Sequence, residues 1–216
     1  LDDGKLLLII TETHNEYVVG KVVVGGKLTS NKGINLPDTV LSTPSFTEKD
    51  KDDLQFGLIH FVDAFALSFV RSAQDIITVR DVIDSLNQTE GYNPLLIAKI
   101  EKPEAIEQID SIIEVSDGIM VARGDLAIET AVYKVPSYQK LIITKANRQN
   151  KFVIIATQML ESMTFNPTPT RAEASDVANA VLDNADALML SGETAVGSYP
   201  VETIQTMSSI IIETES

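Results

Sequence analysis

A chain of 216 residues with 44% hydrophobic residues is long enough for one large or two small domains with a sizeable core. The formal net charge of −14 argues against a nucleic-acid partner, because phosphate binding needs a basic patch and Lys and Arg do not cluster in the sequence. The absence of cysteine excludes disulfides and thiol catalysis, and no apolar run suggests a signal peptide or a membrane span, so we expect a cytoplasmic protein.

The first part of the chain has the pattern of a β-ribbon. Residues 6–24 carry runs of Leu, Ile, Val and Thr that are interrupted at Asn15 and Gly20, which predicts short strands separated by turns. A loop rich in Pro, Ser and Thr follows at residues 37–45. Thr47 comes next, with an acidic residue three positions later, and this spacing predicts the start of a helix.

Strand and helix patterns alternate through the rest of the chain, which indicates a parallel sheet with helices packed on it. Five strands cannot close an eight-stranded barrel, so the pattern by itself permits either an open doubly wound sheet or part of a barrel. The expected strands are 64–69, 95–100, 118–122, 152–156 and 187–190. The expected helices are 48–58, 73–86, 103–113, 136–148, 171–182 and 200–212.

Charged residues appear where two of these strands end. Lys99 lies at the end of the run 95–100 and Glu101 follows it, while Asp125 comes shortly after the run 118–122. Lys99 and Glu101 are two residues apart, so their side chains turn to the same side of a strand. Two carboxylates beside a lysine can hold a hard divalent cation and stabilise negative charge on a substrate, as phosphoryl or enolate chemistry requires.

Each of these residues also has a structural interpretation. Lys99 and Glu101 could form a salt bridge at a strand end, because buried charges are costly unless they are paired. Asp125 could cap a helical turn, and Thr157 could be an ordinary threonine at the end of the run 152–156. The residue types and spacings alone leave these alternatives open.

Several ordered blocks of sequence carry a further signal. The block at 97–101 reads Ile-Ala-Lys-Ile-Glu, and the block at 116–126 contains Val-Ala-Arg-Gly-Asp. Together the blocks closely resemble the pyruvate kinase family from end to end of this chain. The other blocks that carry the resemblance are 156–163, 169–181 and 190–195, with shorter matches at 32–37 and 66–71.

The resemblance implies an α/β fold, namely a partial TIM (β/α)8 barrel with a small β-rich remnant of a lid domain at the N-terminus. Residues 1–40 would belong to the lid, and residues 41–216 would form the C-terminal part of the catalytic barrel. Relative to the family, the first three barrel strands, the first part of the lid and the carboxyl-terminal domain are absent. We therefore expect a fragment of a larger enzyme that is inactive as an isolated chain.

The resemblance also implies a reaction, the transfer of phosphate from phosphoenolpyruvate to ADP to give pyruvate and ATP in glycolysis. Lys99 would neutralise charge at the transferring phosphoryl group and the enolate, while Glu101 and Asp125 would bind Mg²⁺ or Mn²⁺. Gly124 and Asp125, through their backbone N–H groups, would bind the substrate carboxylate with Thr157, which would also help to position a proton. The family further implies K⁺ for the complete enzyme and a homo-oligomer, usually a homotetramer.

Other residues have supporting roles in this interpretation. Arg123 is expected to be an orienting salt-bridge partner. Ser191 follows the last strand at the same face as the other site loops and is expected to support the site. Thr170 and Glu173 have the spacing of a capping box. Ala127 departs from the family, which usually has glycine there.

Two rival interpretations remain. A metal-dependent lyase or aldolase on a similar barrel would also stabilise an enolate with a metal and two carboxylates. A non-catalytic fragment or pseudoenzyme would keep the residues of the site without the activity.

Overall fold

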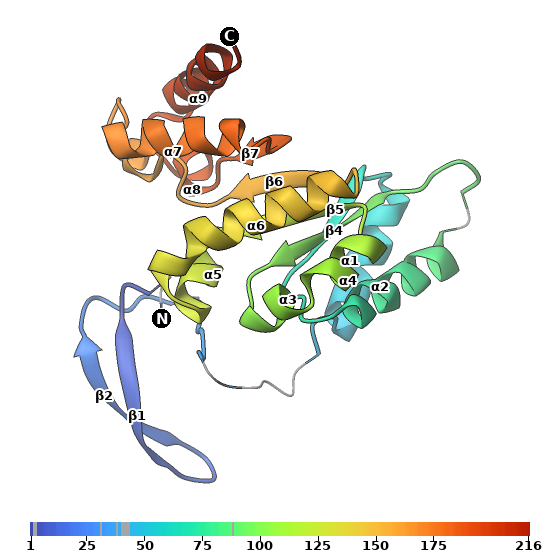
Figure 1. Ribbon diagram of the computed structural model, residues 1–216. Helices are drawn as coiled ribbons and strands as arrows, with labels where there is room; N and C mark the ends of the chain where they lie inside the picture. The colour runs from blue at the N-terminus through green and yellow to red at the C-terminus, as the bar shows by residue number, and fades with distance from the viewer. Residues whose placement is uncertain (2–3, 31, 38, 40–43, 88) are drawn as a thin grey trace.

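The computed structural model describes residues 1, 4–30, 32–37, 39, 44–87 and 89–216. Within these residues the chain forms a two-stranded antiparallel sheet and a five-stranded parallel sheet flanked by helices. Figure 1 shows the two-stranded hairpin projecting away from the helices, with the N-terminus close to helix α5. None of the helices in the described part of the chain combines the length and apolar character needed to cross a bilayer.

The hairpin consists of β1 (Leu7–Thr13) and β2 (Val18–Val24). It confirms the expected β-ribbon, but the prediction of an interruption at Gly20 was wrong. Gly20 lies inside β2 and pairs with Ile10, directly beside a register shift in β1. A glycine within a strand often marks such an irregularity instead of ending the strand.

The parallel sheet has the order β3-β4-β5-β6-β7, so each strand lies beside the next one in the sequence. This order is the arrangement of a (β/α)8 barrel, whereas a doubly wound sheet reverses its strand order. The chain therefore forms part of a barrel. The five expected strands are confirmed, with small differences at the ends of the first and last: β3 (Ala64–Leu67), β4 (Leu95–Ile100), β5 (Gly118–Ala122), β6 (Phe152–Ala156) and β7 (Ala187–Met189).

The helices follow the expected order with one error and two additions. The expected helix at 103–113 is two helices that meet at Gln108, although buried residues continue on both sides of the break. Helices α5 and α8 were not predicted, because four to seven residues are too few to show a helical period. The helices are α1 (Glu48–Ile59), α2 (Ala73–Leu86), α3 (Pro103–Glu107), α4 (Ile109–Val115), α5 (Arg123–Glu129), α6 (Val135–Arg148), α7 (Arg171–Leu182), α8 (Gly192–Ala195) and α9 (Pro200–Glu215), with 3-10 turns η1 (Val132–Lys134) and η2 (Glu161–Thr164).

The expected helix starts have a direct structural basis. Thr47 caps α1, because its hydroxyl accepts the backbone N–H of Asp50 while the Asp50 carboxylate accepts the backbone N–H of Thr47. Thr170 and Glu173 form the same reciprocal pair at the start of α7. Both capping boxes confirm the predictions from sequence.

The sheet has two differently packed faces. Leu96, Ala98 and Ile100 of β4 belong to the main hydrophobic core, which includes residues of the surrounding helices. Ile97 belongs instead to a smaller cluster with Met120 and Ala156. Because side chains alternate along a strand, Lys99 shares the face of Ile97, which is the interior face of a barrel.

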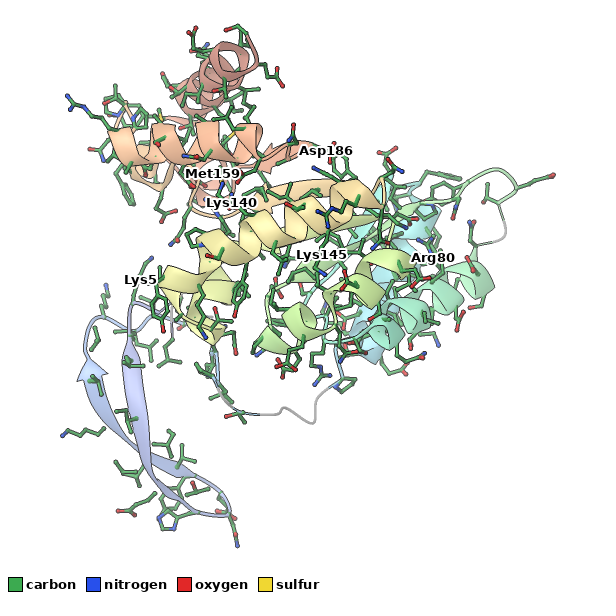
Figure 2. All side chains as sticks on the ribbon, viewed as in Figure 1. Lys5, Arg80, Lys140, Lys145, Met159 and Asp186 are labelled. Atoms are coloured by element: carbon green, nitrogen blue, oxygen red, sulfur yellow. The ribbon has the colours of Figure 1, made fainter. Side chains whose placement is uncertain are left out.

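The amino-terminal ends of the strands are tied together by carboxylates. Asp117 precedes β5, accepts the backbone N–H of Leu96 at 2.7 Å and pairs with Arg80 of α2. Asp186 precedes β7 and accepts the backbone N–H of Val153 at 2.8 Å. Figure 2 labels Arg80 and Asp186, which lie away from the strand ends that carry the candidate site. These contacts stabilise the sheet at the amino-terminal ends of its strands, the side of such barrels that contributes to stability and not to catalysis.

The two edge strands of the sheet lie beside cavities. A cavity of about 600 Å³ is lined by Leu54, Phe65 and Leu67 near β3. A second cavity of about 340 Å³ is lined by Leu188, Leu190 and Ile204 near β7. An unpaired strand beside apolar surface is a site for association with another strand.

Candidate active site

The candidate residues meet at the carboxyl ends of β4, β5 and β6. Glu101 directly follows β4, Asp125 lies in α5 directly after β5, and Thr157 directly follows β6. These three strands are parallel neighbours, so their carboxyl ends lie at the same edge of the sheet. Barrel enzymes carry their catalytic residues at this edge.

Lys99 and Glu101 form a close ion pair. Lys99 Nζ lies 2.6 Å from Glu101 Oε1 and donates a hydrogen bond to Ser68 Oγ at 2.7 Å. The second oxygen, Glu101 Oε2, accepts the backbone N–H of Phe69 at 2.8 Å. Lys99 and Glu101 therefore do form a salt bridge at the strand end. The expected orientation of both side chains to one side is confirmed.

The two members of this pair differ in access to solvent. The Glu101 side chain is 1% exposed, whereas the Lys99 side chain is 24% exposed. A buried carboxylate is tolerated because a cation and an N–H group share its charge. The lysine ammonium remains within reach of a molecule at the strand ends.

Asp125 lies in the first turn of α5, but it does not cap the helix. The residue at the cap position is Ala122, and α5 begins at Arg123, so the capping interpretation of Asp125 was wrong. Asp125 Oδ1 accepts a hydrogen bond from Asn35 Nδ2 at 3.1 Å. No hydrogen bond joins its second oxygen, Oδ2, to another residue in the described part of the chain.

Thr157 occupies a strained backbone position. Its φ angle is +72° and that of Gln158 is +54°, in the left-handed region that β-branched residues rarely adopt. The interpretation of Thr157 as an ordinary strand residue therefore does not hold. Strain of this kind persists only where neighbouring contacts enforce it, and it concentrates at functional sites.

The hydroxyl of Thr157 joins the loops after β5 and β6. Thr157 Oγ1 accepts the backbone N–H of Gly124 at 2.8 Å and donates to the backbone carbonyl of Ala156 at 2.6 Å. Two residues that were expected to contact the same substrate carboxylate are thus in direct contact. In this arrangement the Gly124 N–H group is directed at the threonine hydroxyl.

Arg123 binds the backbone of the strained residues Thr157 and Gln158. Its guanidinium donates to the backbone carbonyls of Thr157 at 2.8 Å and Gln158 at 3.2 Å. It also pairs with Asp176 of α7 at 2.6 Å, while its side chain is only 10% exposed. Figure 2 labels the neighbouring Met159, whose sulfur lies 2.8 Å from Arg123 Nη2. The expected ion pair is present, and its contacts are those of an orienting residue.

Ser191 lies between β7 and α8, and its contacts are local. Its backbone N–H donates to Glu193 Oε2 at 2.8 Å. Glu193 is fully buried, and its other oxygen accepts the backbone N–H of Leu160 at 3.3 Å. Ser191 is therefore connected to the loop after β6 through Glu193.

Other residues around the site were also missed. Ser68 contacts Lys99, and Asn35 contacts Asp125, although both lie in blocks that carry the family resemblance. Lys102 and Glu129 form a buried ion pair at 2.8 Å beside them. The positions of Ser68 and Asn35 along the chain do not predict these contacts. The one signal in the sequence was that both residues lie in blocks that resemble the family.

The carboxylates suit a magnesium site. Within the described residues no group of three or more His, Cys, Asp or Glu side chains is arranged to hold a metal ion. Mg²⁺ is commonly held by one or two carboxylates together with water and substrate phosphate oxygens. Glu101 and Asp125 supply hard oxygen donors at adjacent strand ends, so the residues present fit this ion.

Comparisons with known proteins agree with this geometry. Residues 1–204 match the family model described as pyruvate kinase, barrel domain. The chain is 48% identical over 216 residues to a pyruvate kinase of Clostridium acetobutylicum, and 51% identical over 215 residues to one of Mycobacterium tuberculosis. It is 50% identical over 215 residues to a pyruvate kinase of Methylorubrum extorquens.

These matches cover the whole of this chain but only part of each relative. The matched region is 45% of the Clostridium and Mycobacterium proteins and 44% of the Methylorubrum protein. The chain therefore spans somewhat less than half the length of these relatives. Because the family model matches almost all of the sequence and the sheet has the strand order of a barrel, the chain belongs to the pyruvate kinase family.

Proposed function

We propose that this chain contributes the catalytic strand ends of a pyruvate kinase. The enzyme would transfer a phosphoryl group from phosphoenolpyruvate to ADP and protonate the resulting enolate to pyruvate, as a step of glycolysis. The observation that carries the proposal is the pair of Lys99 and Glu101 at the end of β4, beside Asp125 and Thr157 at the next two strand ends. The identity of about half of all residues to proteins named pyruvate kinase supports it.

Lys99 would act on charge that develops during the reaction. When the bond between the phosphorus and the enol oxygen of phosphoenolpyruvate breaks, negative charge grows on that oxygen as the phosphoryl group passes to an ADP oxygen. An ammonium group that is already oriented by Ser68 and Glu101 can stabilise this charge without reorganising.

Glu101 and Asp125 would hold the divalent ion, Mg²⁺ or Mn²⁺. Such an ion polarises phosphoryl and enolate oxygens as a Lewis acid. Each carboxylate oxygen has more than one lone pair, so Glu101 can keep its contacts with Lys99 and Phe69 while it contributes to the site.

Thr157 and the start of α5 would bind the substrate carboxylate. The Gly124 and Asp125 N–H groups lie in the first turn of a helix, where N–H groups lack helical partners and favour anions. To accept the Gly124 N–H, the substrate carboxylate would replace the Thr157 hydroxyl as its acceptor. The released hydroxyl could then help to position a proton, and its high ordinary pKa suits a relay better than a donor.

The proposal extends to features of the complete enzyme. We place residues 1–40 in the β-rich lid domain and residues 41–216 in the barrel domain. K⁺ would be an additional cofactor, held by strands outside this chain. The enzyme would act in the cytoplasm as a homo-oligomer, a homotetramer if it follows the family. Arg123 and Ser191 would support the site without touching the substrate.

Metal binding gives a test that is independent of turnover. Glu101→Gln and Asp125→Asn each remove one charged donor, so in the complete enzyme each should weaken Mn²⁺ binding at least about tenfold. Isothermal calorimetry with Mn²⁺ measures this directly. Asp84→Asn, on the exposed side of α2, is the matched control and should leave the affinity unchanged.

The same variants must keep their fold for the test to decide. Circular dichroism should show the helix content of the unmodified protein in each variant. Mn²⁺ affinity that is unchanged in both Glu101→Gln and Asp125→Asn would overturn the proposed metal site.

A further inference from the structure

Asn35 connects a distant segment to two carboxylates of α5. It lies between β2 and α1, 90 residues before Asp125 in the sequence. Its Nδ2 atom donates to Asp125 Oδ1 at 3.1 Å and to Glu129 Oε1 at 3.2 Å. One amide group therefore bridges two acidic side chains.

The bridge stabilises an unfavourable arrangement in α5. Asp125 and Glu129 are four residues apart and share a helix face, where like charges destabilise each other. Glu129 is neutralised by Lys102, whose Nζ lies 2.8 Å from the same oxygen that Asn35 contacts. Glu129 thus has a cation as a partner, whereas Asp125 accepts its hydrogen bond from the neutral amide of Asn35.

We infer that Asn35 is a positioning residue for Asp125 as a metal ligand. The inference rests on the proposed function, in which Asp125 holds the divalent ion. An N–H group donated to Oδ1 restricts rotation of the carboxylate and occupies only one of its two oxygens. Outer partners that orient metal ligands in this way typically contribute 10-fold to 100-fold in metal affinity.

The chain contacts α5 at a second position besides Asn35. Gly4, before the hairpin, lies against α5 as well, since a Cβ atom at Gly4 would come within 3.4 Å of Ile128 Cγ1. The chain thus meets α5 on both sides of the hairpin, at Gly4 before β1 and at Asn35 after β2. Figure 1 shows the N-terminus and the start of the hairpin beside α5. Both Gly4 and Asn35 therefore lie against the helix that carries Asp125.

The inference is tested by changing only the donor at position 35. In the complete enzyme, Asn35→Leu keeps the size of the side chain and removes its N–H groups, so Mn²⁺ affinity should fall about 10-fold to 100-fold. Asn35→Gln keeps an amide donor and should therefore lose less Mn²⁺ affinity than Asn35→Leu. Asn179→Ala is the control, because Asn179 is exposed on α7 and bonds to Ser175 of its own helix.

Mn²⁺ binding is measured by titration with electron paramagnetic resonance detection of the free ion, which does not depend on turnover. The inference is wrong if Asn35→Leu stays within about twofold of the unmodified protein while Asp125→Asn weakens binding. It is also wrong if Asn35→Gln loses as much affinity as Asn35→Leu. In both cases the proposed metal site stands, whereas unchanged affinity in Asp125→Asn would overturn the inference together with that site.

Discussion

Removal of the Lys99 ammonium group tests the proposed chemistry most directly. This group lies 2.6 Å from Glu101 Oε1 and 2.7 Å from Ser68 Oγ, and the side chain is 24% exposed. A unit charge acting on another at about 4 Å contributes about 4 kcal/mol at an effective dielectric constant of about 20. Since about 1.4 kcal/mol changes a rate tenfold, Lys99→Met should lower kcat about 1000-fold.

The assay follows pyruvate formation from phosphoenolpyruvate and ADP by the complete enzyme. KM for phosphoenolpyruvate should change little, because the charge that Lys99 stabilises develops in the transition state. Lys49→Met is the control, since Lys49 is an exposed lysine of α1 that pairs with the surface carboxylate of Asp53. This control should keep the kcat of the unmodified protein.

The variant also needs a test of its structure. Lys99→Met leaves the buried carboxylate of Glu101 with the Phe69 N–H as its remaining partner, which costs several kcal/mol of stability. Circular dichroism therefore accompanies the assay, and Lys99→Arg, which keeps the positive charge, should retain more of the kcat than Lys99→Met. A loss of kcat below about tenfold, or a change in KM alone, would refute the proposed role of Lys99.

Two further predictions concern stability and association. Burial opposes ionisation of Glu173, but hydrogen bonds from Ser162 and Thr170 hold its pKa below the usual 4.5. Glu173→Gln should therefore lower the free energy of unfolding by about 1 kcal/mol at neutral pH, as measured by urea unfolding. The difference between the two proteins should shrink as the pH falls through the pKa of Glu173 in the folded state, because the carboxylate then takes up a proton. A difference that stays constant with pH would contradict the assignment. The 216 residues alone should associate and lack pyruvate kinase activity, because edge strands β3 and β7 adjoin apolar cavities. A monomeric, active protein whose mass matches this sequence would disprove this expectation.

Local sequence patterns predicted the elements that have local causes. Apolar runs of strand length placed the five strands of the sheet, and the spacing of Thr170 and Glu173 predicted the start of α7. The two-residue spacing of Lys99 and Glu101 predicted their shared orientation, because alternation along a strand is independent of the rest of the fold. Helices α5 and α8 escaped prediction because they are too short to display a period.

The sequence by itself therefore determined which strands form, where most helices begin and which charged groups stand at the strand ends. Tertiary structure alone decided which of those groups meet. Asn35, in the segment before α1, reaches Asp125 across 90 residues, and Arg123 reaches Asp176 of α7 across 53, because the folded chain packs these separate segments against one another. Contacts of this kind depend on how the elements pack together, and no spacing along the chain records that packing.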